Sequence, residues 1–396
     1  MRAPKKIATV ITEYRKWSHA DVIVGKILEG YRYDGRAKPD LQVASMFVDQ
    51  FPANDMSRDL AKKYNFNIYP TIAEALTLGG KKLAVDGVII IGEHGTYPKN
   101  DIGQILYPRR RFFEECTKVF EASSRSVPVF SDKHLAASWN DAKWMYDKSR
   151  MLFFPFLAGS SIPLTWRKPK LDLKKDSPLS GLVQIGYGPF EGYGFHALEG
   201  MQCLAERRRG GETGVKAVTC LSGSAMWQPL DKKVFSQVLL EECIKRAPSH
   251  AKGSYREITA SNKEAGLFLI EYEDGLLAAV AMLNGFLFEG DGGAFCGAIQ
   301  LGAEKQPQSC QFYLQQPDPF AHFSYLVKAI ESMMHSNHAP YPVERTLLTT
   351  GILDAVMHSK AQAGLKIETP HLRLKYSPTD WPYASDPIPE AIKRTW

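Results

Sequence analysis

Two residues of this 396-residue chain, Lys133 and His196, have side chains suited to moving protons. Lys133 stands between Asp132 and His134, directly after a short apolar segment. Burial there would lower the pKa of the ammonium and make it a proton donor, or a hydrogen-bond donor to a carbonyl or alkoxide oxygen. His196 follows a glycine-rich segment, residues 186–194, where backbone can approach a ligand closely. Its imidazole can exchange a proton near neutral pH.

A second set of polar residues is expected where open parallel sheets bind ligands, beyond the carboxyl ends of their strands. The ends of the strands predicted below carry Thr12, Arg15, Asp49, Glu93, His94 and Asp132. An aspartate at the end of the second strand, such as Asp49, is suited to accept hydrogen bonds from a ribose diol. We therefore predict that these six residues bind a cofactor.

The first 158 residues alternate short apolar runs with helical patterns, which is typical of βαβ units that build a parallel sheet. Strands are expected at 7–12, 41–48, 85–91, 127–130 and 151–157. The run 85–91 is almost unbroken in apolar residues, as a strand buried on both faces should be. These patterns predict a Rossmann-type dinucleotide-binding domain over residues 1–158.

The pattern changes from about residue 159. A stretch rich in proline and lysine, 163–178, precedes further strand-like runs. Two of these, 267–273 and 276–288, are separated by Asp274-Gly275, which is a strong hairpin signal. Helices are expected at 320–335 and 343–363. We predict an α/β domain over residues 159–396 that contains antiparallel sheet.

The composition excludes several classes of protein. With 44% hydrophobic residues, 23% charged residues and a net charge of +6, the chain is an ordinary globular protein. Its longest apolar run, 276–288, is interrupted by Asn284 and is shorter than the roughly 20 residues of a membrane-spanning helix. The N-terminus does not resemble a secretory signal, so we expect no membrane association and a cytoplasmic location.

Nucleic acid and metal are not expected as ligands. The two strong basic runs, 109–111 and 207–209, stand alone without interleaved aromatic residues. The six cysteines form no Cys-x-x-Cys pair, so the sequence predicts neither a zinc site nor a disulfide framework.

Four segments, in this order, resemble the Gfo/Idh/MocA family, named after glucose-fructose oxidoreductase and inositol dehydrogenase. Residues 85–91 look like its fourth strand, and residues 131–136, Ser-Asp-Lys-His-Leu-Ala, are similar to its Glu-Lys-Pro-Leu-Ala motif. Residues 194–199, Gly-Phe-His-Ala-Leu-Glu, are similar to its Gly-x-His-x-x-Asp motif, and 342–359 to its closing helix. The resemblance covers nearly the whole chain.

The resemblance implies a Rossmann domain followed by an α/β domain with a large open, mostly antiparallel sheet that commonly forms a homo-oligomer interface. It implies an oxidoreductase that uses NAD or NADP to act on a sugar, polyol or related carbinol or ketone. Lys133 would bond the reacting oxygen, and His196 would serve as acid or base.

Three departures from the family pattern bear on function. The family opens with a glycine-rich loop after the first strand, but residues 12–19 contain no glycine, so Tyr14 and Trp17 are expected to obstruct the usual cofactor pose. His134 replaces a proline whose peptide bond is commonly cis. The catalytic aspartate of the family falls on Gly192, which leaves Glu191 as a substitute carboxylate.

Two further functions therefore stay open. Without nicotinamide, His196 and Lys133 would suit a redox-neutral lyase or isomerase acting on a keto-sugar, because proton abstraction next to a carbonyl needs a base and an oxyanion stabiliser. A non-catalytic binding subunit is compatible with the same fold. If a nucleotide binds, the charge of Asp49 favours NAD over NADP.

Overall fold

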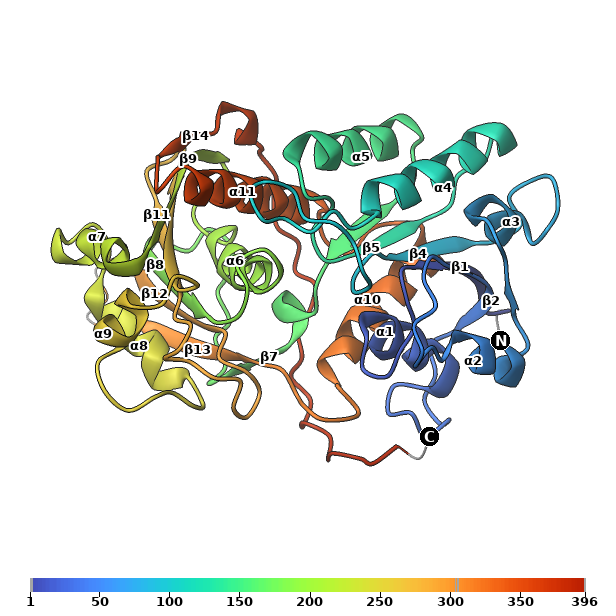
Figure 1. The fold of residues 1–396 in the computed structure, drawn as a ribbon, viewed down its shortest axis with the longest axis horizontal. Helices are drawn as coiled ribbons and strands as arrows, with labels where there is room; N and C mark the ends of the chain where they lie inside the picture. Colours follow the sequence, from blue (N-terminus) through green and yellow to red (C-terminus); the bar gives the residue numbers. More distant parts are fainter. Residues whose placement is uncertain (1–2, 303, 305, 395–396) are drawn as a thin grey trace.

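The computed structural model describes residues 3–302, 304 and 306–394. It contains two sheets, each covered by helices on both faces, that lie side by side (Figure 1). The first is a six-stranded parallel sheet with strand order β3-β2-β1-β4-β5-β6. Its strands are β1 (Lys5–Ile11), β2 (Leu41–Val48), β3 (Asn67–Ile68), β4 (Gly87–Ile91), β5 (Val129–Asp132) and β6 (Phe156–Gly159). This strand order is that of a Rossmann fold, as predicted.

The alternation of buried residues along β1 explains how helices cover this sheet. Ile7 and Ile11 face one side, where they pack with α1 (His19–Glu29), α2 (Ser57–Tyr64) and α10 (His322–Ser336). Ala8 and Val10 face the other side, because successive side chains of a strand point to opposite faces. There they pack with α3 (Ile72–Thr77), α4 (Arg109–Ser123) and α5 (Trp139–Met151).

The second sheet has eight strands in the order β14-β9-β10-β11-β8-β12-β13-β7, and all its pairs are antiparallel except β8 with β11. The strands are β7 (Trp166–Lys168), β8 (Leu179–Gly186), β9 (Val215–Ser222), β10 (Gly266–Tyr272), β11 (Leu277–Met282), β12 (Cys296–Leu301), β13 (Gln308–Tyr313) and β14 (Ile367–Glu368). The predicted hairpin is the β10–β11 pair. The α/β class predicted for both halves is therefore confirmed.

The inner face of this sheet, toward the first domain, is covered by α6 (Gly192–Ala205) and α11 (Glu344–Ala361). The outer face of the sheet is not exposed to solvent. The helices α7 (Gln228–Asp231), α8 (Gln237–Arg246) and α9 (Tyr255–Ala260), with the short helix η2 (Gly223–Trp227), cover it around a buried cluster that includes Leu240 and Ala279 (Figure 1). An oligomer formed through this sheet, as the resemblance implies, would have to displace the chain's own helices.

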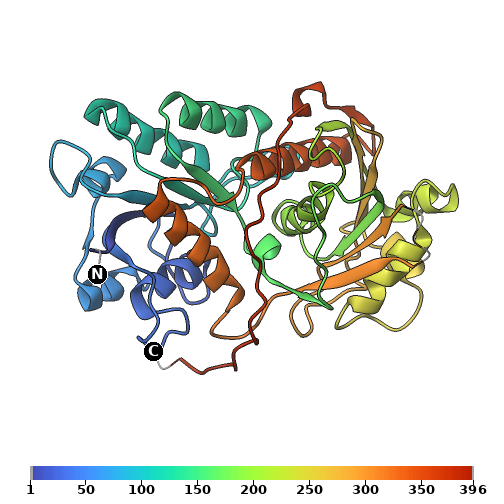
Figure 2. The same ribbon diagram turned by 180° about the vertical axis from the view of Figure 1, so that it is seen from behind.

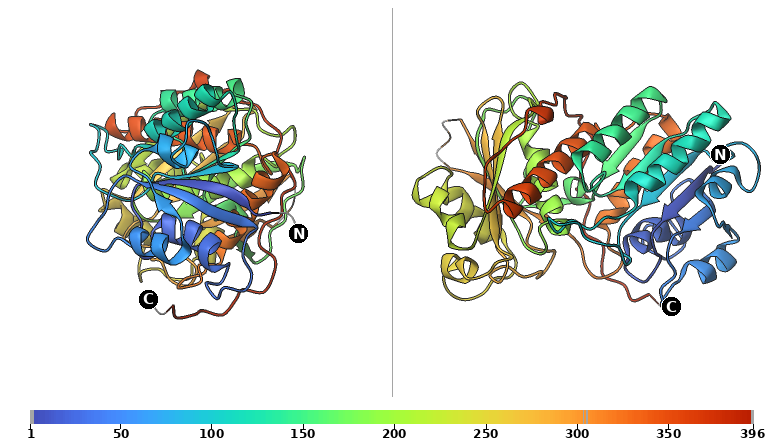
Figure 3. Two further views of the ribbon diagram at one scale, coloured as in Figure 1. Left: turned by 90° about the vertical axis from the view of Figure 1, so that its right-hand side faces the viewer. Right: turned by 45° about the horizontal axis from the view of Figure 1, so that its top comes forward.

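Two segments from the end of the chain cross back to the first domain. Helix α10 packs against α1, so the first domain includes residues far beyond 158. The C-terminal tail continues from β14 and the short helix η3 (Pro370–Leu372), passes between the two domains and ends beside α1 (Figure 2). Helix α11 also bridges the domains, because it contacts α5 of the first and α6 of the second (Figure 3).

The strand predicted at 151–157 is displaced. Helix α5 runs to Met151 and β6 begins at Phe156. Of the predicted strand, only Met151 belongs to α5, residues 152–155 form the turn after it, and the strand itself extends to the small residues Ala158 and Gly159.

Candidate functional site

Polar residues from both domains meet where the carboxyl ends of β4 and β5 face the N-terminus of α6. Five of them, Glu93, Arg109, Lys133, His134 and Glu191, form one connected set that we call the junction site. All five are buried. The first four belong to the first domain and Glu191 to the second.

Glu93 is the centre of the junction site. Its two carboxylate oxygens accept from Arg109 at 2.6 Å and pair with the Lys133 ammonium at 3.2 Å. Burial alone would raise the pKa of Glu93, but the charges of Lys133 and Arg109 outweigh it and hold the pKa well below its usual range. Glu93 is therefore ionised and fixes the position of the lysine predicted to be catalytic.

His134 connects this group to the second domain. Its Nε2 lies 2.8 Å from Arg109 Nη1 and 3.1 Å from Glu191 Oε1. Burial, followed by the charge of Arg109, lowers the pKa of His134, so the ring is neutral at pH 7. Burial raises the pKa of Glu191, but His134 and Arg109 outweigh it and keep this carboxyl ionised.

His196 lies in the second turn of α6, with its ring edge-on to Tyr193 and Phe295. Burial, followed by the charge of Lys133, lowers its pKa well below the ordinary value. The ring is therefore neutral at pH 7, and Lys133 lies near enough for its charge to act on the ring. The structure thus places the two residues predicted to move protons close together, although 63 positions separate them in the sequence.

A histidine that the sequence analysis did not select completes the arrangement. His19, the first residue of α1, places its Nδ1 2.6 Å from Oδ2 of the fully buried Asp132. Its ring meets that of His94 edge-on, with centroids 5.4 Å apart. Burial, followed by the charge of His19, lowers the pKa of His94 to about 3. Asp132 and His94, predicted as cofactor contacts, therefore both hold His19.

Several buried polar atoms around these residues have no hydrogen-bond partner in the described part of the chain. They include His94 Nε2, Asp132 Oδ1, Ser131 Oγ and His196 Nδ1. An unsatisfied buried donor or acceptor costs about 1–3 kcal/mol. Four such atoms at the ends of β4 and β5 and on α6 indicate a binding place for a polar molecule.

Strained backbone accompanies these residues at each of the three central strand ends. Trp17, His94 and Lys133 follow β1, β4 and β5, and their φ angles are +62°, +70° and +64°. Side-chain-bearing residues pay roughly 1–2 kcal/mol for this left-handed conformation, which clusters at functional sites. Among the described residues only bonds that precede proline are cis, so the Lys133–His134 bond is trans.

Three of the predicted cofactor contacts are already engaged within the protein. The Thr12 hydroxyl donates to the Glu93 carbonyl at 2.5 Å. Arg15 pairs with Glu13 at 2.6 Å. The first bond holds the start of the glycine-free loop beside the residues that follow β4, and the second lies within the loop itself.

Asp49, predicted to meet a ribose, is engaged in the same way. Its Oδ1 accepts from Arg111 at 2.5 Å and its Oδ2 from the Tyr97 hydroxyl at 2.7 Å. A ribose diol would have to compete with both donors.

The two aromatic residues expected to obstruct a cofactor, Tyr14 and Trp17, have different surroundings. Tyr14 is fully buried between β1 and α1, with its hydroxyl 3.4 Å from the position that a Cβ atom on Gly25 would take. Trp17 is about half exposed, and its indole N–H donates to Asp318 at 3.2 Å. The predicted obstruction by Tyr14 is therefore wrong, because the side chain joins the core rather than the crevice.

Within residues 3–302, 304 and 306–394, no group of three or more His, Cys, Asp or Glu side chains is arranged to hold a metal ion. No helix in the same part of the chain is long and apolar enough to cross a membrane. All six cysteines are free and buried.

No family model and no curated protein sequence matches this chain. Solved structures do match over almost its full length. GenD2 from gentamicin A biosynthesis, in complex with NAD, has a TM-score of 0.57 at 12% identity and covers 93% of this chain and 97% of its own. Scyllo-inositol dehydrogenase from Lactobacillus casei, with bound NAD(H) and scyllo-inositol, has a TM-score of 0.55 at 13% identity, with coverages of 92% and 99%.

Myo-inositol dehydrogenase from the same organism, in complex with NAD(H) and myo-inositol, has a TM-score of 0.57 at 9% identity and covers 92% of this chain and 96% of its own. At these identities the likeness shows the fold alone. The chain thus has the two-domain fold of these dehydrogenase structures, and its activity has to be argued from its own side chains.

Sequence reasoning missed His19 and Arg109. Arg109 was grouped with its neighbours as a basic run, although the three arginines separate in the structure: Arg109 is buried on Glu93, while Arg110 and Arg111 lie nearer the surface. A histidine at the start of a helix that follows the first strand was the available signal for His19, since that helix terminus faces the predicted ligand edge.

Proposed function

We propose that the protein is an oxidoreductase that interconverts a hydroxyl group and a carbonyl group on a small polyol or sugar-like molecule, with NAD or NADP as the redox partner. The observation that carries this proposal is that Lys133, fixed by its ion pair with Glu93, acts electrostatically on the neutral ring of His196 across the domain junction. The fold, shared with structures that contain NAD(H) and an inositol, supports it.

The two side chains divide the proton chemistry between them. The Lys133 ammonium would donate a hydrogen bond to the reacting oxygen and stabilise negative charge that develops on it. The neutral His196 would accept the hydroxyl proton during oxidation and return it during reduction. The contact of His134 Nε2 with Glu191 would hold the second domain beside Lys133.

Along the carboxyl edge of the first sheet, a nicotinamide nucleotide would fit differently at the ends of β4 and β5 than at the end of β2. At the ends of β4 and β5, the unpartnered atoms of His94, Ser131 and Asp132 could bond the polar edge of such a group. At the end of β2, Asp49 would accept a ribose hydroxyl only after releasing Arg111 or Tyr97. When bound, the nicotinamide would supply hydride transfer, which no side chain of the protein can perform.

Asp49 and Thr12 already have hydrogen-bond partners within the protein, and this favours a second candidate, a redox-neutral enzyme. Without a nucleotide, His196 would remove a proton from a carbon next to a carbonyl, and Lys133 would stabilise the resulting enolate oxygen. This reaction needs only the groups that the structure brings together, and its substrate would be a keto-sugar.

The experiment that tests the proposal titrates the purified protein with NADH and NADPH and follows nicotinamide fluorescence. Saturable binding at micromolar concentration supports the oxidoreductase and leads to a polyol and sugar screen. In that screen Lys133→Ala should lower kcat by about 10²–10⁴-fold, while the nucleotide Kd changes little. Lys143→Ala is the matched control, since Lys143 is partly exposed and its ion pair with Asp147 lies on the surface of α5.

The absence of binding up to millimolar nucleotide would overturn the oxidoreductase. The redox-neutral candidate is then tested in D₂O, where the protein should exchange the hydrogen next to the carbonyl of a keto-sugar, and Lys133→Ala should abolish that exchange.

A further inference from the structure

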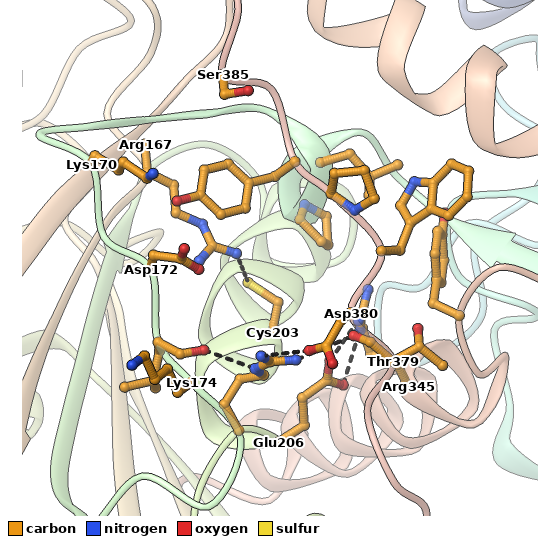
Figure 4. A pocket seen from close by; sticks show the side chains of 18 residues that line it. Arg167, Lys170, Asp172, Lys174, Cys203, Glu206, Arg345, Thr379, Asp380 and Ser385 are labelled. Atoms are coloured by element: carbon orange, nitrogen blue, oxygen red, sulfur yellow. Dashed lines mark hydrogen bonds and ion pairs between the residues drawn. The ribbon is translucent and has the colours of Figure 1, made fainter.

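A second binding place lies at the opposite end of α6 from the junction site. There a cavity of about 390 Å³ opens between η1 (Ile162–Leu164), β7, the C-terminus of α6, the start of α11 and the C-terminal tail (Figure 4). We call it the rear cavity. Cys203 and Glu206 line it. At 1.5 Å per residue they lie about 10 and 15 Å along the helix from His196, so the rear cavity is separate from the junction site.

Basic side chains outnumber acidic ones in the rear cavity. Its lining contains Arg167, Lys170, Lys174, Arg207 and Arg345, against Asp172, Glu206 and Asp380. Two of these cations are neutralised, because Arg345 makes a bidentate pair with Glu206 and Arg207 pairs with Asp380 at 2.9 Å (Figure 4). Asp380 also pairs with Lys175, so its single negative charge is already shared between two cations.

Three cations remain against one exposed carboxylate, Asp172, and Arg167 is the most confined of the three. Its Nη1 donates to the Leu171 carbonyl at 2.8 Å, and its Nη2 reaches only the thiol of Cys203, at 3.8 Å. Its Nε is buried without a hydrogen-bond partner in the described chain. Burial raises the pKa of Cys203, so the thiol stays protonated and contributes no negative charge.

Neither Arg167, Lys170 nor Lys174 makes an ion pair within the described residues. A guanidinium presents a planar fork of donors that matches a phosphate or carboxylate group, and Arg167 is partly buried. The lining thus has a donor set that an anion would complete.

The remaining walls are aromatic and apolar. Tyr341, Trp381 and Tyr383 line the cavity together with Pro163 and Leu164. The ring of Tyr383 lies 4.1 Å from Arg167 Cζ and holds the guanidinium in place. Such walls favour an organic molecule with a flat or apolar part over a bare inorganic ion.

We propose that the rear cavity binds a small organic anion, whose phosphate or carboxylate group bonds to Arg167 while its ring or carbon skeleton lies against Tyr341, Trp381 and Tyr383. Because residues 379–383 of the C-terminal tail form one wall, the ligand would also fasten the tail to the domain junction. The proposal does not depend on the chemistry of the junction site.

The test titrates the full-length protein with phenyl phosphate, benzoate and inorganic phosphate and records tryptophan fluorescence and Tm. We expect saturable binding with a Kd below about 1 mM for one of the two aromatic anions. Phenol, which has the same ring but no anionic group, serves as the neutral control and should not bind. Stronger binding of phenyl phosphate or of benzoate decides which anionic group the cavity takes.

Arg167→Gln should weaken this binding at least tenfold, whereas Arg256→Gln should leave it unchanged. Arg256 is a matched control because it is a partly exposed arginine of the same domain that pairs with Asp231. If Arg167→Gln does not fold, the double variant Lys170→Gln/Lys174→Gln should still weaken binding severalfold, since both lysines are exposed. Equal binding by the wild type and these variants, or no saturable binding to the wild type, would overturn the proposal.

Discussion

The imidazole of His19 joins the N-terminus of α1 to the carboxyl end of β5 through a 2.6 Å hydrogen bond from its Nδ1 to Asp132 Oδ2. A carboxylate can only accept, so Nδ1 of His19 carries a proton and donates it to Asp132. Asp132 thereby orients His19 in the way that a buried carboxylate orients a catalytic histidine. His19 is therefore a third candidate for proton transfer, beside Lys133 and His196.

Asp132→Asn should keep the fold but lower turnover by about 10²-fold or more, because an amide donates to Nδ1 and reverses the tautomer of His19. Turnover and Tm of the variant test this directly. The control is Asp147→Asn at an exposed position of α5. Unchanged turnover in Asp132→Asn would show that His19 has no part in the reaction.

Glu93→Gln should lower the free energy of unfolding by about 3–5 kcal/mol, since it leaves the almost fully buried Arg109 without a counter-ion. The same substitution at Glu114, whose pair with Arg110 is partly exposed, should cost about 0–1 kcal/mol. Urea denaturation of both variants gives the comparison. Equal effects would contradict a structural role for the Glu93–Arg109 pair.

His322 should make the stability of the protein depend on pH. Burial, followed by the charge of Lys26, lowers the pKa of His322 to about 3. Between pH 6.5 and 3 the unfolded chain therefore binds a proton at this histidine that the folded protein does not, and stability is lost as pH falls. From pH 7.5 to 5.0 this loss is about 2 kcal/mol.

The measurement compares the wild type with His322→Phe, which removes the titrating group. The change in unfolding free energy between pH 7.5 and 5.0 should differ between them by about 2 kcal/mol. This difference isolates His322 from Glu199, whose burial raises its pKa to about 7 and which therefore acts in the opposite direction. Identical pH dependence in the two proteins would contradict the prediction.

Arg394 should fasten the C-terminal tail to the first domain. It pairs with Asp21 at 2.6 Å and with Asp318 at 3.0 Å, and both carboxylates are buried. Arg394→Gln should lower the free energy of unfolding by about 3–5 kcal/mol and expose Trp381 and Tyr383 to chymotrypsin. Lys393→Gln, one position away and exposed, should do neither. A tail that is equally resistant in both variants would show that Arg394 does not hold it.

Apart from the two-residue strand β3, the order of strands in the first sheet was predictable from the sequence, because the periodicity of apolar residues is a local property. The run 85–91 gave β4, and the Asp274-Gly275 turn gave the β10–β11 hairpin. The strand ends indicated where polar residues gather, since all strands of a parallel sheet end at one edge. Lys133 and His196 could be selected because their residue types and neighbours suit proton transfer.

Directions and partners of side chains could not be predicted, because they depend on residues far away in the chain. The sequence shows a tyrosine in a glycine-free loop, but only packing against α1 turned Tyr14 into the core. The sequence shows an aspartate at the end of β2, but only the fold brought Arg111 and Tyr97 to it.

The sequence by itself therefore determined the α/β class, the two sheets and the edge at which chemistry is expected, since each follows from local patterns of burial. Only the tertiary structure decided that His19 meets Asp132 across 113 positions, that α7–α9 close the outer face of the second sheet, and that the tail returns to α1. Such contacts reflect the packing of whole elements and the pairing of buried charges, and no local pattern encodes either.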